Sequence, residues 1–341
     1  MEAVPPGAAR PVFFAGPQRG GSTFLRALVN AHPALSLPRH TEIDIAARLM
    51  ARTGPHRYPS AQRYVRALHR SRRFRQHGNV ADPGRAFPDL VRSLLAQSRQ
   101  RAAEQVVGAT VHQDFAQLLR IWPDARFVFL QRDPRAVAQS ALKRGWAGNY
   151  FTAATQWLRC WRQWQALRER VPAEDLLLIA YEDLVADRDG VMARVFEHLG
   201  VPAATGAELA AAGRPDAERA GAFLARLHPH DIVLIEARVG AALVEAGYRP
   251  LTPPRARLRR WAPLVLAVDE GLARLRLDRR RIGVTLLAAQ ALTRPLHPGA
   301  HEDLKDAAML RRRAYGDDRH RRACASLVSP PGRPTWLVTT T

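Results

Sequence analysis

The stretch GPQRGGST (residues 16–23) follows the apolar run VFFA (residues 12–15) and precedes FLRALVNAH, a segment with helical character. It has the length and glycine spacing of a phosphate-binding loop, G-x-x-x-x-G-K-[ST], but Ser22 stands where that motif has lysine. Glycines permit close backbone approach, and a helix that begins at such a loop points its N–H groups at an anion. Without a lysine to reach β- and γ-phosphates, the loop suits a single phosphate with a leaving bond, and Arg19 is placed to bridge its oxygens.

Short apolar runs of the kind found in buried parallel strands recur along the chain at residues 12–16, 106–111, 126–132 and 176–183. Helical stretches separate them, and one of these carries Trp157, Trp161 and Trp164 at the spacing of one helix face, which favours core packing. This alternation predicts a parallel sheet covered on both faces by helices. The expected fold class is therefore α/β, with three layers.

Composition limits the class of protein. The chain has 341 residues, 47% of them hydrophobic, and a formal net charge of +21. The apolar content supports a real core, and the charge predicts attraction to anions, although an arginine-rich genome explains the charge equally well. The two cysteines, Cys160 and Cys324, are far apart and suggest neither a disulfide framework nor a zinc site. We find no signal-peptide pattern and no membrane-spanning run, so a cytoplasmic protein is expected.

Two changes in composition suggest how the chain is divided. Residues 247–260, GYRPLTPPRARLRR, are rich in Pro and Arg, so a boundary is expected near residue 250. This gives a domain over residues 10–250 and an Arg/Ala/Pro-rich, mostly helical extension over residues 251–341. Residues 45–81 contain many arginines and no acidic residue, which indicates equally an insertion that contacts substrate or a solvated basic surface.

A second anion site is indicated by FLQRDPRAVAQSALKR (residues 129–144). Arg132 ends a predicted strand, Asp133 and Pro134 are suited to start a helix, and Ser140 and Arg144 are i, i+4 neighbours on that helix. We expect Arg132, Ser140 and Arg144 to converge on a second phosphate at the carboxyl edge of the sheet. Two separate phosphate sites on one sheet imply a bisphosphate nucleotide.

An ordered set of motifs now resembles a known family, the sulfotransferases that use 3′-phosphoadenosine 5′-phosphosulfate (PAPS), and most closely their bacterial and Golgi-type branch. The motifs are GPQRGGSTFL (16–25), NAHP (30–33), RDPRAVAQS (132–140), YEDLVADRDGVMARVFEHLGVP (181–202) and EARVGAALVEAGY (236–248). The resemblance covers about residues 10–250. It implies a P-loop-NTPase-like parallel sheet and sulfuryl transfer from PAPS, which leaves the bisphosphate PAP.

The resemblance also implies roles for particular residues. Those of the 5′-phosphosulfate loop are Arg19, Gly20, Gly21, Ser22 and Thr23. Arg132, Ser140 and Arg144 become the 3′-phosphate site, and Tyr181 a weaker cofactor contact. The chain departs from the commonest pattern at Gly20, where a serine or threonine usually stands, and at Ser22, where threonine is usual. The missing hydroxyl removes one donor and leaves the backbone cradle intact.

Sulfuryl transfer needs a base that takes the proton of the acceptor. Glu42 follows Thr23 by 19 residues, near the position of the catalytic Glu of related enzymes, and is the first candidate. His112 is the second, because cytosolic relatives place a His at similar spacing before the RDP-like motif, and His40 is the third. Arg19 would neutralise charge on the leaving phosphate. A sulfuryl group carries less charge than a phosphoryl group, and the sequence shows no metal-ligand cluster, so no metal is expected.

Other classes of protein remain in competition. A P-loop kinase or nucleotide hydrolase needs the missing lysine and a magnesium-binding Asp that is not evident. A non-enzymatic basic module that binds anions would leave the ordered motifs unexplained, and no nucleic-acid-binding motif is present. The acceptor is left open among small molecules, carbohydrates and lipids. The basic surface also leaves open a peripheral membrane contact, and the sequence does not indicate an oligomeric state.

Overall fold

The computed structural model describes residues 10–37, 42–71, 74–75, 78–97, 106–213, 221–253, 257–282 and 338–339. The chain divides into two compact units. The first comprises Met1–Asp133 and Arg159–Ala222, and the second comprises Pro134–Leu158 and Phe223–Thr341. The boundary expected near residue 250 stays a prediction, since both of its sides fall within the second unit.

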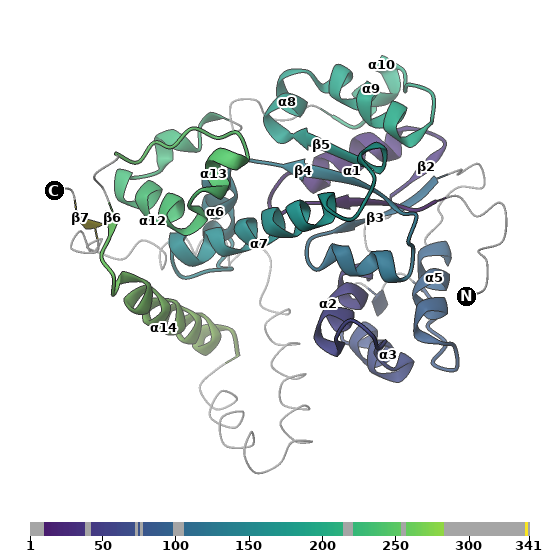
Figure 1. The fold of residues 1–341 in the computed structure, drawn as a ribbon, viewed down its shortest axis with the longest axis horizontal. Helices are drawn as coiled ribbons and strands as arrows, with labels where there is room; N and C mark the ends of the chain where they lie inside the picture. Colours follow the sequence, from purple (N-terminus) through teal and green to yellow (C-terminus); the bar gives the residue numbers. More distant parts are fainter. Residues whose placement is uncertain are drawn as a thin grey trace, which may run out of the picture. The chain divides into compact units, whose positions relative to one another are not determined.

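The first unit is built on a five-stranded parallel sheet with the order β2-β3-β1-β4-β5 (Figure 1). The strands are β1 (Val12–Ala15), β2 (Leu35–Ser36), β3 (Val106–Val111), β4 (Arg126–Gln131) and β5 (Leu176–Ala180). The central strand β1 pairs on both sides, with Val12 opposite Gly108 in β3 and Arg126 in β4. The four apolar runs are therefore confirmed as parallel strands. The two-residue β2 is too short to leave such a run in the sequence.

One face of this sheet is covered by the helices that follow β1 and β5. They are α1 (Ser22–Ala31), α8 (Tyr181–Ala186), α9 (Arg188–Leu199) and α10 (Gly206–Ala211); the last three lie above the sheet in Figure 1. Alternate residues of the strands, such as Phe14 and Val128, join Leu28 of α1 and Phe196 of α9 in one buried cluster. Because successive side chains of a strand point to opposite faces of the sheet, the residues on either side of Phe14 in β1 point to the other face.

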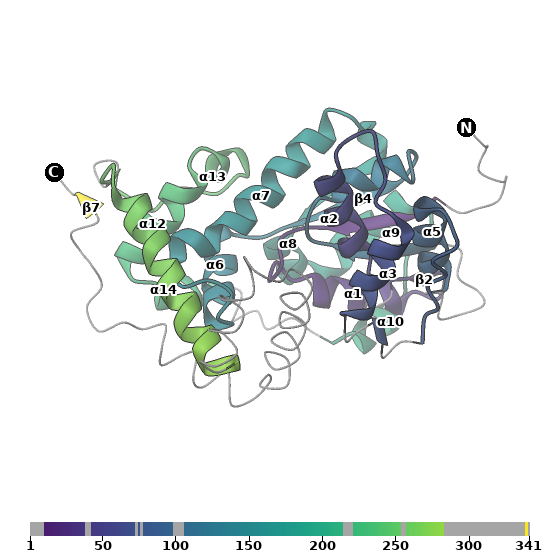
Figure 2. The ribbon, with the colours of Figure 1, turned by 90° about the horizontal axis from the view of Figure 1, so that it is seen from below.

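The opposite face is aromatic. Phe13 and Phe129 point there, and Phe129 stacks on Trp164 with ring centroids 4.9 Å apart. Trp157, Trp161 and Trp164 of α7 (Tyr150–Arg168) are all buried, so the expectation of core packing is confirmed. The other elements on this side are α2 (Ile43–Thr53), α3 (Ala61–His69), α5 (Phe87–Gln97) and the 3₁₀ turn η1 (Phe115–Arg120) (Figures 1 and 2). With both faces covered, the three-layer α/β prediction is confirmed for this unit.

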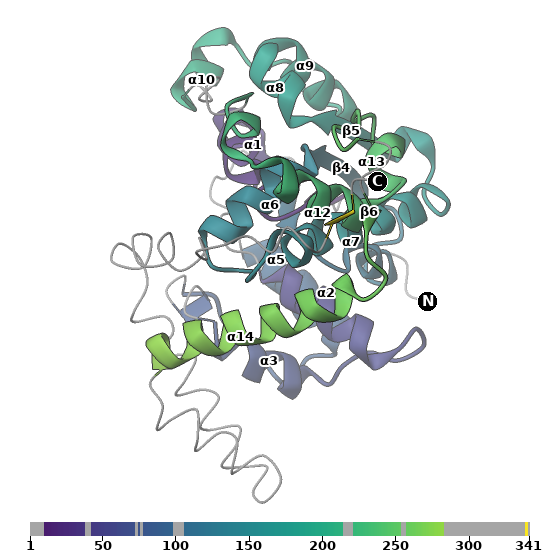
Figure 3. The same cartoon turned by 90° about the vertical axis from the view of Figure 1, so that its left-hand side faces the viewer.

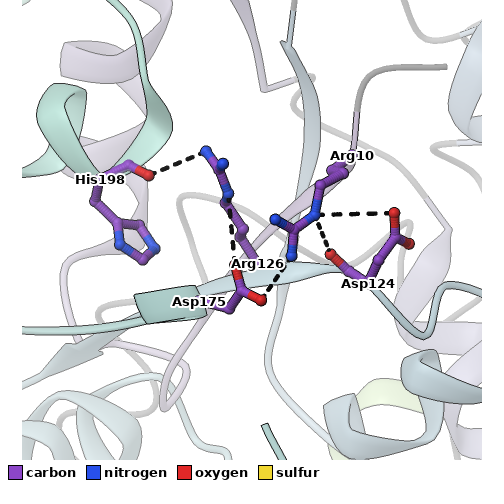
Figure 4. Close-up of polar contacts among 5 residues, drawn as sticks. All are labelled: Arg10, Asp124, Arg126, Asp175 and His198. Carbon is purple, nitrogen blue, oxygen red and sulfur yellow. Dashed lines mark hydrogen bonds and ion pairs between the residues drawn. The ribbon is translucent and has the colours of Figure 1, made fainter. Parts of the chain in front are cut away.

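The amino edge of the sheet is held by a polar cluster (Figure 4). Asp175, in the 3₁₀ turn η2 (Ala173–Asp175) directly before β5, lies 2.6 Å from Nη2 of Arg10 and 3.7 Å from Nε of Arg126. Arg126 also donates to the carbonyl oxygen of His198 at the end of α9. These contacts join the starts of β1, β4 and β5 at the edge opposite the predicted phosphate loop.

The second unit is mostly helical (Figure 3). Its elements are α6 (Pro134–Lys143), the first part of α7, η3 (Leu224–Arg226), α12 (Pro229–Val239), α13 (Ala242–Glu245), α14 (Ala262–Ile282) and the antiparallel pair β6 (Arg257–Leu258) and β7 (Val338–Thr339). A buried ion pair of 2.9 Å joins Arg135 of α6 to Glu236 of α12, and Glu236 also accepts the N–H groups of Leu251 and Thr252. The predicted helical C-terminal region is confirmed by α14. None of the described helices is long and apolar enough to cross a membrane.

Candidate active site

Four neighbouring strands each end next to a residue or loop that the sequence analysis predicted to be part of the functional site. The predicted phosphate loop follows β1 at Gly16, and His112 follows β3. Arg132 follows β4, and Tyr181 follows β5. Because the carboxyl ends of parallel strands lie at one edge of a sheet, these four residues lie along the same edge, which is where ligands bind in open α/β sheets.

The loop between β1 and α1 is a tight turn that exposes backbone N–H groups. Gly20 donates its N–H to the carbonyl oxygen of Pro17 at 2.9 Å, and Arg19 adopts a φ of 72°, which is rare outside glycine. A Cβ at Gly20 would lie 2.8 Å from that same oxygen, so the glycine that departs from the family pattern suits this turn. The first turn of α1, at Ser22 and Thr23, contains no acidic residue. Its first N–H groups have no partner within the helix and attract an anion.

Arg132 and Tyr181 close against this loop. Nη1 of Arg132 donates to the carbonyl oxygen of Arg19 at 3.1 Å, and its guanidinium carbon lies 4.2 Å from the centre of the Tyr181 ring. The ring also lies against Gly21, where an added Cβ would be 2.3 Å from Cδ2 of Tyr181. The phosphate loop, a cation and an aromatic ring therefore meet at one place within the first unit.

His112 is held by contacts from three other segments. Its Nδ1 lies 2.9 Å from the carbonyl oxygen of Gly16, its backbone N–H donates to Oδ1 of Asp44 at 2.7 Å, and its carbonyl oxygen accepts from Sγ of Cys160 at 3.0 Å. A carbonyl oxygen can only accept, so the ring hydrogen lies on Nδ1. In the neutral ring, the lone pair is then on Nε2, which is the tautomer that a general base needs. Burial raises the pKa of the Cys160 thiol, which keeps it neutral.

Glu42 immediately precedes α2, on the same helix that supplies Asp44. Its Oε1 accepts from the hydroxyl of Ser71 at 2.7 Å, and its side chain is partly exposed. The hydroxyl of Tyr64 contacts the carbonyl oxygen of Glu42 at 3.4 Å. Burial and then the negative charge of Glu42 raise the pKa of Tyr64 far above its ordinary value, so the phenol stays protonated.

The remaining predicted residues are placed separately. Ser140 lies on α6, and Arg144 directly after it, both in the second unit, so their convergence with Arg132 stays a prediction. His40 lies outside the described residues. Among the residues that are described, no group of three or more His, Cys, Asp or Glu is arranged to hold a metal ion.

Sequence reasoning missed the residues that hold the candidate bases in place. Asp44 and Ser71 reach His112 and Glu42 across gaps of 68 and 29 residues. No motif marks either residue. The only signal was that Asp44 lies two residues after Glu42, near the start of α2, and its role becomes clear once the structure shows that α2 packs beside β3.

The fold and the site define a class: an α/β protein with a glycine-rich loop after its first strand, no lysine in that loop, and an arginine after β4. A family model described as the sulfotransferase family matches residues 11–205, which is more than half of the chain. The chain belongs to the sulfotransferase family.

Solved structures of similar fold include several sulfotransferases. The sulfotransferase domain of the Synechococcus PCC 7002 olefin synthase is 22% identical, with a TM-score of 0.46, and the match covers 72% of this chain and 97% of that one. The domain from the curacin biosynthetic pathway is 16% identical, with the same TM-score, over 72% and 99%. Retinol dehydratase in complex with androsterone and the inactive cofactor PAP is 17% identical, with a TM-score of 0.39, over 70% and 82%. No curated protein matches the chain.

Proposed function

We propose that the protein transfers a sulfuryl group from PAPS to a hydroxyl or amine of an acceptor molecule. The observation that carries the proposal is the meeting of the loop, Arg132 and Tyr181 at the edge where β1, β4 and β5 end. The loop and Arg132 can each bind a phosphate, and the Tyr181 ring can contact an aromatic base or sugar between them. The arrangement therefore fits a nucleotide with phosphates at two positions. Membership of the sulfotransferase family supports the same conclusion.

The residues that would hold the nucleotide are assigned from this arrangement. The N–H groups of Gly21 to Thr23, with the hydroxyls of Ser22 and Thr23, would face the 5′-phosphosulfate, while the N–H of Gly20 closes the turn onto Pro17. Arg19 would balance charge on the phosphate. Arg132 would bind the 3′-phosphate, the role that the family resemblance also gives to Ser140 and Arg144. Bound PAPS supplies an activated sulfuryl group, and the chain supplies position and electrostatic stabilisation.

We propose that His112 is the base that takes the proton from the acceptor molecule. Its fixed tautomer leaves Nε2 basic, and its contact with Gly16 ties the ring to the phosphate loop. Glu42 is the alternative, and the one that the sequence placed first. One oxygen of its carboxylate already accepts a hydrogen bond from the hydroxyl of Ser71.

The acceptor belongs to one of three classes: a small molecule, a carbohydrate or a lipid. Several arginines of the segment 45–81 are exposed on and around α2 and α3, which suits an acidic acceptor. We place the reaction in the cytoplasm.

Isothermal titration calorimetry with PAP, AMP and ATP tests the proposal. We expect PAP to bind much more tightly than AMP, because only PAP fills the site at Arg132. Charge-assisted hydrogen bonds are worth about 1.5–3 kcal/mol. Arg132→Ala should therefore lower the affinity for PAP by roughly 10- to 150-fold, and the affinity for AMP far less. The exposed Arg194 on α9 provides the control, Arg194→Ala, which should change neither affinity. Equal affinity of the wild-type protein for PAP and AMP would contradict the proposal, and tight ATP binding with magnesium-dependent turnover would favour a kinase.

A further inference from the structure

Helix α14 is fixed within the second unit by one of its faces. Ala262 and Leu266 are buried against Leu234 of α12. Further along the same face, Glu270 accepts the N–H of Gly148 at 2.6 Å, and the carbonyl oxygen of Leu266 accepts from the amide of Asn149 at 2.8 Å. These contacts decide which side of α14 packs on the protein, and so which side faces away.

The side that faces away is apolar. Its exposed side chains, with their exposed fractions, are Leu264 (72%), Val268 (64%), Leu272 (46%) and Leu275 (56%), and Trp261 (40%) stands just before the helix. At 100° per residue the four aliphatic positions fall within an arc of about 80°, and they extend along roughly 16 Å of the helix. We call these five residues the α14 stripe. Single exposed apolar residues are ordinary, but a continuous row of them marks an interaction surface.

Cations flank the α14 stripe. The exposed ones are Arg259 and Arg260 before the helix and Arg274 and Arg276 within it. The guanidinium of Arg259 lies 6.0 Å from the centre of the Trp261 ring. Among the described side chains, two acids lie nearby: Glu270 accepts from Gly148 and pairs with Arg274, and Asp269 lies 3.2 Å from the amide of Asn149. Arg259, Arg260 and Arg276 therefore carry the charge argument.

We propose that α14 is an interfacial helix that lays the α14 stripe on an anionic lipid surface. A lipid surface accepts aliphatic side chains and an indole below the level of the head groups, and anionic head groups attract the flanking arginines. A second copy of this chain fits less well, because pairing two such faces brings the arginines of both copies together. The buried opposite face of α14 keeps the helix flat on the surface. This role is independent of the proposed activity.

Co-sedimentation with vesicles tests the proposal on the full chain. We expect binding to phosphatidylcholine vesicles that contain phosphatidylglycerol, weaker binding to phosphatidylcholine alone, and loss of binding at high salt. Leu264→Ser/Leu275→Ser should lower the partition coefficient by at least about tenfold, because the binding strength follows the apolar area that enters the lipid. The matched control is Val244→Ser/Leu251→Ser, two exposed apolar residues of the same unit, which should bind like the wild type.

A second measurement does not depend on whether the stripe variant, Leu264→Ser/Leu275→Ser, folds stably. Lipids with brominated acyl chains should quench tryptophan fluorescence of the wild type, and Trp261→Phe should remove that quenching. The proposal is overturned if the wild type stays in the supernatant with both vesicle types. It is equally overturned if the stripe variant binds like the wild type, or if light scattering shows a dimer that the stripe variant dissociates, which would make the stripe an interface between copies.

Discussion

Nδ1 of His112 lies 2.9 Å from the carbonyl oxygen of Gly16, so the residue after β3 is joined directly to the first residue of the phosphate loop. The backbone N–H of the same histidine is joined to Asp44 of α2. The loop, the candidate base and the helix that carries the alternative base therefore form one connected structure. These hydrogen bonds position His112, as proton transfer requires.

Removal of the Asp44 carboxylate should loosen His112 without touching the nucleotide. Asp44→Ala leaves the His112 N–H without its charged acceptor, an interaction worth about 1.5–3 kcal/mol, so we expect kcat to fall by ~10- to 100-fold while PAP affinity is kept. Asp44→Asn keeps an acceptor oxygen and should recover most of the rate. Steady-state kinetics with PAP calorimetry measures both. Asp89→Ala, at an exposed acid of α5, is the control, and a loss of PAP affinity equal to the loss of kcat would argue against a positioning role.

Gly21 should be intolerant of a side chain because Tyr181 occupies the space. Its φ is 104° and an added Cβ would lie 2.3 Å from the Tyr181 ring, whereas Gly54 has a φ of 94° and nothing within 4 Å. With a ψ of 171°, Gly54 lies in a backbone region that only glycine adopts readily, so Gly54→Ala reports backbone strain without a steric contact, of about 1–3 kcal/mol. We expect Gly21→Ala to cost more stability in urea unfolding, and to abolish PAP binding that Gly54→Ala keeps.

The double variant Gly21→Ala/Tyr181→Ala separates the two causes. Removing the ring relieves the steric contact. The double variant should therefore lose about as much free energy of unfolding as Gly54→Ala and Tyr181→Ala lose together. If Gly21→Ala and Gly54→Ala were equally mild, the close contact between loop and ring would be wrong.

The sheet could be predicted because each strand is a local apolar run, and β1, β3, β4 and β5 begin at the expected residues. The loop and Arg132 could be predicted because motifs mark them. The two-residue β2 has too few residues to form a pattern. The partners of His112 come from α2 and α7, distant in sequence, so their contacts depend on how helices pack on the sheet and no local signal records them.

His198 should make the protein sensitive to mild acid. Burial, followed by the charge of Arg126, lowers its pKa below the ordinary value of 6.5, so the folded state favours the neutral ring. The unfolded chain takes up the proton more readily. The stability that this group contributes is therefore complete above pH 6.5 and is lost as the pH falls from there through the lowered folded pKa.

Chemical denaturation between pH 5 and pH 8 measures this effect. His198→Gln should flatten the dependence in the window below pH 6.5, because the variant has no ring to protonate. His56→Gln, at an exposed histidine, should leave the wild-type profile unchanged. A wild-type stability that stays constant across the window would contradict the prediction.

The last prediction decides between His112 and Glu42. If His112 takes the proton of the acceptor, His112→Ala should lower kcat by ~10²–10⁴, the usual contribution of a positioned base, and PAP should still bind. Glu42→Gln keeps an acceptor for the Ser71 hydroxyl, so it should retain turnover within a few-fold. The converse result, an inactive Glu42→Gln beside an active His112→Ala at saturating substrate, would assign the proton to the carboxylate.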